Sequence, residues 1–175
     1  NRRVDFSDVE IVAQLETAWK KGAASYKQDE RIVKHYAEIL FKLDQKEQAA
    51  KVIEVALNKS WSDGLVKCYG DLDFGSPDRQ LLIAERWIKS RPRNTSLLVA
   101  LGRIAMRGEL WGKAREYFNT SIEIAPTADA HGELARLLKA FGEEELADVH
   151  QEKFLQGIGA ELATLPLPQA PNKPE

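Results

Sequence analysis

The chain has 175 residues, of which 43% are hydrophobic and 30% charged, which is ordinary for a globular protein. Its net charge of -2 excludes a general electrostatic attraction to nucleic acid or to an anionic membrane. The single cysteine, Cys68, excludes an intrachain disulfide and a multi-cysteine metal site. No apolar run approaches the roughly 18 to 20 residues that a membrane-spanning helix needs.

The N-terminal segment predicts a helix over residues 7–22. Ser7 stands at the N-cap position, Glu10 completes a capping box, and an amphipathic pattern follows. We expect this helix to pack in front of the later elements, so that residues 1–29 form an N-terminal packing region. The chain begins with Asn1 and its one methionine is Met106, so we expect a fragment of a longer protein.

Further helix starts are predicted where capping residues precede segments that have apolar residues at helical spacing. Ser76 is followed by Pro77, which suits the first helical position. Asn94 and Thr127 are the other expected N-caps. Alternating apolar and polar runs flanked by hairpin turns are missing, so strands are not predicted.

Small residues recur at a nearly fixed interval in the predicted helices from residue 30 onward. They stand 33, 32 and 33 residues apart, and each follows a Tyr or a Leu. Their positions are Ala37, Gly70, Gly102 and Ala135. Where two antiparallel helices cross closely, a large side chain would separate the backbones, so Gly or Ala is favoured at the contact. We therefore interpret this column as a row of helix crossings.

A second small column lies in the second helix of the predicted pairs, at Ala49, Ala114 and Ala147. Phe118 fills the groove beside the crossing, and Pro126 ends the third pair. This order and spacing resemble the tetratricopeptide repeat, a two-helix unit of about 34 residues. The alternative is an unrelated helical bundle whose spacing is coincidental.

The sequence therefore predicts an all-α, right-handed tetratricopeptide-like solenoid of about four helix pairs. The repeat domain is expected at residues 30–158, with units at 30–61, 62–93, 94–126 and 127–158. The second unit is degenerate, because "DLDFGSP" interrupts it and Leu82 stands where an alanine is expected. Residues 159–175 are rich in proline, which cannot continue a helix, so we expect a flexible tail there.

The first helices of such arrays line a concave surface that binds extended or helical partner segments. Steps of four and three residues along each predicted first helix select this face. The expected partner-binding residues are Lys34, Glu38, Phe41, Lys67, Asp71, Phe74, Arg103, Met106, Arg136 and Lys139. An apolar line beside Arg and Lys suits a partner with apolar and acidic residues. The alternative is an ordinary solvated face, with Phe41 and Phe74 in the core.

Catalytic and metal-binding constellations are not predicted. The three histidines, His35, His131 and His150, fall in different helices and have no metal-ligand spacing. Phosphate-binding loops and nucleophile elbows are missing. Cys68 is interpreted as a buried small hydrophobe rather than a reactive thiol or a haem ligand. We therefore expect a protein without enzymatic activity, bound metal or nucleic-acid partner, and without a required cofactor.

Two blocks go beyond the general repeat pattern: "LWGKAREYF" at 110–118, which follows Leu101-Gly102, and the segment from Trp61 to Gly70. With them the chain resembles the C-terminal region of the HemY family of tetratricopeptide proteins, over roughly residues 4–157. The resemblance implies a bacterial inner-membrane protein linked to a late step of protohaem synthesis. Its N-terminal membrane helices would precede this fragment and leave the domain on the cytoplasmic face.

Two hypotheses about function follow from the resemblance and the repeat pattern together. The first is a protein-interaction scaffold whose partners are haem-pathway enzymes. The second is a porphyrin-binding or haem-handling protein that uses the concave groove, with Arg or Lys pairing with propionates. His35 and Cys68 would then be the nearest axial-ligand candidates.

Overall fold

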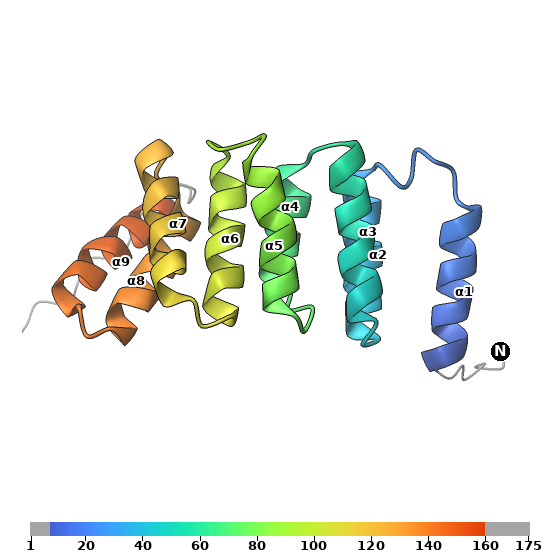
Figure 1. Cartoon of the computed structure of the whole chain (residues 1–175), viewed down its shortest axis with the longest axis horizontal. Coiled ribbons are helices and arrows are strands. Elements are labelled where there is room, and N and C mark those ends of the chain that lie inside the picture. The colour runs from blue at the N-terminus through green and yellow to red at the C-terminus, as the bar shows by residue number, and fades with distance from the viewer. Residues whose placement is uncertain (1–7, 160–175) are drawn as a thin grey trace, which may run out of the picture. The chain divides into compact units, whose positions relative to one another are not determined.

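The computed structural model describes residues 8–159, which form nine α-helices and no strand (Figure 1). The helices are α1 (Asp8–Lys21), α2 (Glu30–Lys42), α3 (Lys46–Lys59), α4 (Asp63–Asp71), α5 (Pro77–Ile88), α6 (Thr95–Arg107), α7 (Trp111–Ile124), α8 (Ala128–Ala140) and α9 (Glu144–Gly159). The prediction of an all-α protein is confirmed.

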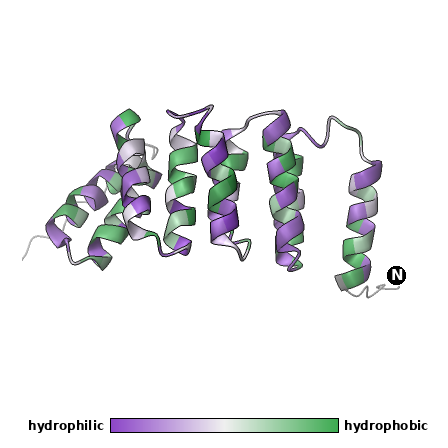
Figure 2. Cartoon of the chain, in the orientation of Figure 1, coloured by the Kyte–Doolittle hydropathy of each residue, from purple (hydrophilic) through white to green (hydrophobic). Residues whose placement is uncertain are grey.

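The described residues divide into two compact units, one that ends at Pro126 and contains α1–α7 and one that begins at Thr127 and contains α8 and α9. Within each unit, the helices have both apolar and polar residues along their length (Figure 2). The predicted cap Ser7 lies outside the described residues. The predicted tail begins at Gly159, which ends α9, and its other residues lie outside the described range.

The predicted helix starts at Asn94 and Thr127 are confirmed. The Asn94 side chain accepts a hydrogen bond from the Leu97 backbone N–H at 2.7 Å, and Thr127 accepts one from Ala130 at 3.2 Å. Ser76 is also an N-cap residue and is followed by Pro77 at the first helical position, but its side chain makes no capping hydrogen bond. The fixed φ of proline suits the start of α5 without this bond.

The eighth residue of each first helix is small and buried, as the periodic column predicts. These residues are Ala37 in α2, Gly70 in α4, Gly102 in α6 and Ala135 in α8. A Cβ atom on Gly102 would lie 2.6 Å from Cζ of the fully buried Phe118 in α7. A Cβ atom on Gly70 would lie 2.6 Å from Cα of Ala100 in α6. The two glycines therefore permit two different close approaches, α6 to α7 and α4 to α6.

The fourth residue of each second helix forms the second buried column. It is Ala49 in α3, Ala114 in α7 and Ala147 in α9, all at most 2% exposed. In α5 this position is held by Gln80, not by Leu82, which is 54% exposed. The expectation that Leu82 takes the place of the alanine is therefore wrong. The segment before α5 is shorter than the repeat interval assumes, so α5 is displaced by two residues.

Gln80 compensates for the early end of α4, which has nine residues where α2, α6 and α8 have 13. Its Nε2 donates to the carbonyls of Tyr69 at 2.5 Å and Leu72 at 3.2 Å. Arg107 of α6 donates to the Gly70 carbonyl at 2.9 Å and to Leu72 at 3.1 Å. Carbonyls at a helix end lack partners within the helix, and these two side chains supply them.

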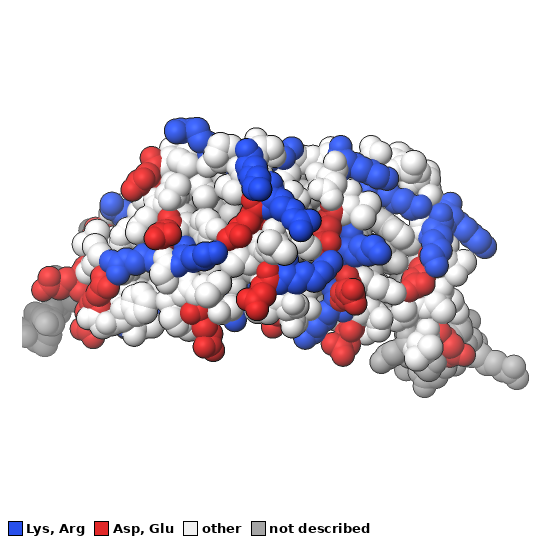
Figure 3. All heavy atoms as spheres, in the orientation of Figure 1, with Lys and Arg blue, Asp and Glu red and all other residues white. Residues whose placement is uncertain are grey.

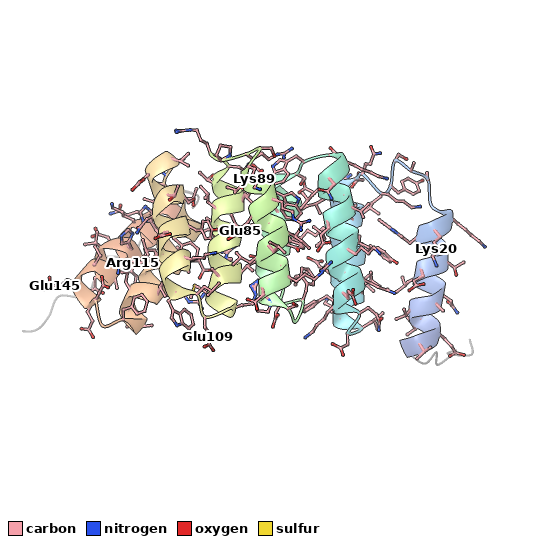
Figure 4. The ribbon with its side chains drawn as sticks, in the orientation of Figure 1. Lys20, Glu85, Lys89, Glu109, Arg115 and Glu145 are labelled. Carbon is pink, nitrogen blue, oxygen red and sulfur yellow. The ribbon has the colours of Figure 1, made fainter. Side chains whose placement is uncertain are left out.

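A row of polar contacts joins successive second helices in the first unit. The ninth residue of α3, Glu54, accepts from the third residue of α5, Arg79, at 3.3 Å. The ninth residue of α5, Glu85, accepts from the third residue of α7, Lys113, at 3.1 Å. Glu85 is labelled in Figure 4, and Tyr117 of α7 also donates to it at 2.9 Å. The repeat therefore fixes polar partners as well as apolar packing.

Replacing Gly70 by Ala tests the close approach of α4 and α6. We expect the free energy of unfolding to fall by about 1–3 kcal/mol, because the added methyl group meets backbone that cannot move without separating the helices. This net loss already includes the roughly 1 kcal/mol that alanine gains over glycine in a helix. Urea unfolding measures the difference.

Gly112→Ala is the matched control, since a Cβ atom there meets nothing within 4 Å. It should leave the free energy of unfolding unchanged or raise it by up to about 1 kcal/mol. Equal effects of the two substitutions would contradict the assignment of Gly70 to a helix crossing.

Candidate functional site

The first helices of the first unit share one solvent-facing side, which we call the first-helix face. It consists of the fifth, ninth and twelfth residues of α2 and α6 and the fifth and ninth of α4. These are Lys34, Glu38, Phe41, Lys67, Asp71, Val99, Arg103 and Met106. Lys34, Lys67 and Asp71 are exposed, whereas Glu38, Phe41, Arg103 and Met106 are partly buried. Val99 is buried, at 5% exposure.

Phe74, which the sequence places on this face, lies elsewhere. The expectation extends α4 by one more turn, but α4 ends at Asp71, and Phe74 falls in the connection to α5. Its ring packs edge-on against Phe41 at 6.1 Å between centroids. It packs against Tyr69 in a tilted arrangement at 5.4 Å. At 8% exposure it belongs to the core, as the alternative interpretation of this residue states.

The charges of the first-helix face are partly paired. Arg103 Nη1 lies 2.6 Å from Asp71 Oδ1, and the Arg103 side chain is only 16% exposed. This contact couples α4 to α6 and reduces the positive charge that Arg103 presents to solvent. Lys34 and Lys67, both at the fifth position of their helices, are exposed.

Cys68 lies beneath these charges and is 4% exposed, so its interpretation as a buried hydrophobe is confirmed. Burial, with smaller contributions from the carboxylates of Glu38 and Asp71 and against the opposing effect of Lys34, raises the pKa of the thiol to about 11. The thiol therefore stays protonated at neutral pH. A protonated, enclosed sulfur is a poor haem ligand.

Two residues of the predicted groove, Arg136 and Lys139, lie on α8 in the second unit and are exposed. Arg136 Nη1 contacts Glu133 Oε2 at 3.0 Å, three residues earlier on the same helix. A pair on one exposed helix surface contributes little to stability and leaves the guanidinium accessible. A single groove through both units stays a prediction.

The second unit also brings together two histidines that the sequence keeps apart. His131 of α8 and His150 of α9 approach to 2.8 Å between their Nδ1 atoms, and His131 is 4% exposed. One Nδ1 must then carry the hydrogen that the other accepts. Burial lowers the pKa of both imidazoles, and the charge of Lys153 lowers both further. The neutral pair is thus the form that the folded unit stabilises.

A cleft of about 540 Å³ lies in the first unit between α1 and α2. Its walls are mainly apolar. They come from α1 with Leu15, Ala18 and Trp19, from α2 with Ile32, Tyr36 and Ile39, and from the connection with Gly22 and Tyr26. Three basic or titratable side chains, Lys27, Arg31 and His35, complete the lining. This cleft is not anticipated in the sequence analysis.

The described residues contain no group of three or more His, Cys, Asp or Glu side chains that could hold a metal ion. None of the helices in residues 8–159 combines the length and apolarity that crossing a membrane requires.

Solved structures of similar shape identify the repeat. A tetratricopeptide-repeat protein of Thermus thermophilus, TTC0263, superposes with a TM-score of 0.61 at 16% identity, over 88% of this chain and 89% of that chain. MamA from Desulfovibrio magneticus RS-1 superposes with a TM-score of 0.57 at 14% identity, over 90% and 99%. The chain has a tetratricopeptide-repeat fold.

No protein-family model matches the sequence, and no curated protein is detectably similar to it. Identities of 14% and 16% establish the fold and leave the function to be argued from the residues. Membership of the HemY family does not follow from them.

The histidine pair and the cleft were missed because both depend on contacts between residues far apart in the sequence. The spacing of 19 residues between His131 and His150 fits no ligand motif, yet it places the side chains on facing helices. His131 is the fourth residue of α8 and His150 is the seventh of α9, and neither position belongs to the two small columns, so the repeat pattern gave no signal for this pair.

The histidine pair predicts a loss of stability in mild acid. Because the folded state lowers both pKa values below 6.5, the unfolded chain binds protons first as the pH falls. The stabilisation is complete above about pH 6.5 and is lost as the pH falls below it. Hydrogen exchange of residues 128–157 at pH 7.5 and 5.5 measures this loss.

His150→Gln should weaken the acid dependence, since it removes one titrating ring and keeps a hydrogen-bonding side chain. His35→Gln, at the exposed His35 of α2, is the matched control and should leave the dependence of α8 and α9 unchanged. An identical pH profile for wild type and His150→Gln would contradict the assignment.

Proposed function

We propose that the chain is a non-catalytic protein-interaction module whose first-helix face binds a segment of a partner protein. The observation that carries this proposal is the repeated order of side chains on α2, α4 and α6. Exposed lysines hold the fifth position in two helices, and the partly buried Phe41 and Met106 hold the twelfth. The tetratricopeptide fold supports the proposal, because its first helices commonly form a binding surface.

The chemistry of the face defines the partner segment. Lys34 and Lys67 stand on adjacent first helices and attract carboxylates, while Phe41 and Met106 offer apolar area. A segment that alternates Asp or Glu with large apolar residues would satisfy both. Arg103 acts differently, because its ion pair with Asp71 holds α4 and α6 together. Changes at Arg103 would alter the face as well as the charge.

Peptide display tests this function without a known partner. We expect selection against the purified chain to enrich peptides with Asp or Glu beside aromatic or aliphatic residues. The double variant Lys34→Gln, Lys67→Gln should weaken their binding by about tenfold or more, since two attractive charges are removed. Fluorescence anisotropy of the labelled peptides measures the dissociation constants.

Lys89→Gln is the matched control. Lys89 is exposed at the C-terminal end of α5, away from the first-helix face, and is labelled in Figure 4. The same loss of binding in this variant would show a general charge effect. Selected peptides that bind the double variant as tightly as wild type would overturn the assignment of the face.

A haem-linked role is the second candidate, and we propose it on the resemblance to the HemY family together with one observation. The cleft between α1 and α2 has apolar walls, His35 as a possible axial ligand, and Lys27 and Arg31 as partners for propionates. On the same resemblance, the partners of the interaction module proposed above would be haem-pathway enzymes at the bacterial inner membrane. Cys68 does not support the haem-linked role, because the sulfur is buried and protonated.

Haem titration checks the second candidate. A saturable one-to-one shift of the Soret band, lost in His35→Ala and retained in His150→Ala, would support haem binding at the cleft. We expect a ligated haem to show at least a tenfold loss of affinity without its axial ligand. A shift that does not saturate, or that survives His35→Ala, would remove the cleft as a haem site.

A further inference from the structure

Helix α1 occupies the position of a second helix of a repeat. Its ninth residue, Glu16, accepts a hydrogen bond from Gln48, the third residue of α3, at 2.6 Å. The ninth and third residues are the positions that join α3 to α5 and α5 to α7. The same contact therefore recurs three times along the second helices, and α1 is the first member of the row.

In each later pair, a first helix packs against its second helix. Among the described residues, no helix packs against α1 in this way. The eighth residues of α3, α5 and α7 are Ile53, Ala84 and Phe118, and each is fully buried. The eighth residue of α1 is Leu15, which is only partly buried and lines the cleft. At α7 this position packs against the first helix of its own pair, through Phe118 and Gly102. The cleft is therefore in the place where such a helix packs.

The floor and walls of the cleft suit an apolar helix face. Trp19 of α1 and Tyr36 of α2 stack at 4.2 Å between ring centroids and hold the two helices together. Ile32 of α2 is 39% exposed beside this stack, and Leu15 and Ala18 face it from α1. A helix of 14 residues, the length of α1, is about 21 Å long and matches this wall.

The charge around the cleft selects the partner. Lys27, Arg31 and His35 lie in the lining, and no Asp or Glu does. On the other side of the Trp19–Tyr36 stack, α1 and α3 enclose a second cleft of about 400 Å³. Its lining contains four lysines, Lys20, Lys27, Lys51 and Lys59, and one carboxylate, Glu16, which pairs with Lys20. Figure 3 shows Lys and Arg side chains gathered over α3 and the segment that connects α1 to α2.

We propose that the cleft between α1 and α2 binds an amphipathic α-helix of a partner protein, apolar on one face and acidic along its flanks. The helix completes the pair that α1 begins, and its carboxylates meet Lys27 and Arg31. This site is separate from the first-helix face, because it uses Arg31, Ile32 and Ile39 of α2. A helix is favoured over a planar ligand because the surrounding positions repeat those that hold a helix in the later pairs.

A pair of synthetic peptides tests the proposal on the whole chain. Each has 14 residues with leucine at helical spacing on one face, and the flanks carry glutamate in one peptide and lysine in the other. We expect the glutamate peptide to bind with a dissociation constant in the micromolar range and the lysine peptide about tenfold or more weakly at 0.15 M salt. Fluorescence anisotropy measures both, and hydrogen exchange should slow in residues 15–22 and 31–39.

Two variants locate the binding. Ala18→Trp fills the cleft from α1, and Ile32→Glu places a negative charge in its wall; both residues are exposed, so the fold should be kept. Each should weaken binding of the glutamate peptide at least tenfold. Leu82→Glu, at the 54%-exposed Leu82 on α5, is the matched control and should leave it unchanged.

The outcomes separate this proposal from the binding function of the first-helix face. Unchanged binding in Ala18→Trp and Ile32→Glu, or equal affinity of the two peptides, would overturn it. If the peptide protected only α4 and α6 from hydrogen exchange, and if Lys67→Gln abolished its binding, the peptide would bind the first-helix face and the proposal for the cleft would be overturned. Displacement of the peptide by one equivalent of haem in a His35-dependent manner would also overturn the proposal, in favour of a porphyrin site. Concentration-dependent dimerisation blocked by the peptide would assign the cleft to a second copy instead.

Discussion

The structure depends on one constraint, which is the small residue at the eighth position of the first helices, where a neighbouring helix packs closely. Gly70 lets α4 lie against Ala100 of α6, and Gly102 lets α6 lie against Phe118 of α7. The distance set there decides which neighbouring side chains meet. Arg103 reaches Asp71, and Arg107 reaches the carbonyl end of α4, because α4 and α6 are close. The same packing therefore decides which charges on the first-helix face are paired across α4 and α6.

The second helix pair of the repeat, α4 and α5, shows how the fold accommodates a shortened helix. Helix α4 is short, so its last carbonyls lack helical partners, and a polar residue replaces the small one in α5. Gln80 donates to two of these carbonyls from a buried position. The same shortening moves Phe74 off the first-helix face and into the core. The hydrogen bonds of Gln80 and the change in the first-helix face therefore have one cause.

The N-terminal end of the first unit combines the repeat with an incomplete pair. Glu16 and Gln48 align α1 with the other second helices, while Leu15 lacks the burial that its counterparts have. Apolar surface left open beside basic side chains is the basis of the binding site proposed there. The two proposed sites would therefore take the same kind of partner, one that combines apolar and acidic residues.

The periodic sequence by itself determined the helix pairs and their columns of small residues. Each helix crossing that tolerates only Gly or Ala places one of these residues at a regular interval in the sequence. The sequence also determined the N-caps at Asn94 and Thr127, whose chemistry is local. Only the tertiary structure decided that α5 is displaced by two residues, that His131 meets His150, and that a cleft lies beside α1. These features depend on where a helix ends and on which surfaces then face each other, and such contacts between distant residues leave no period in the sequence.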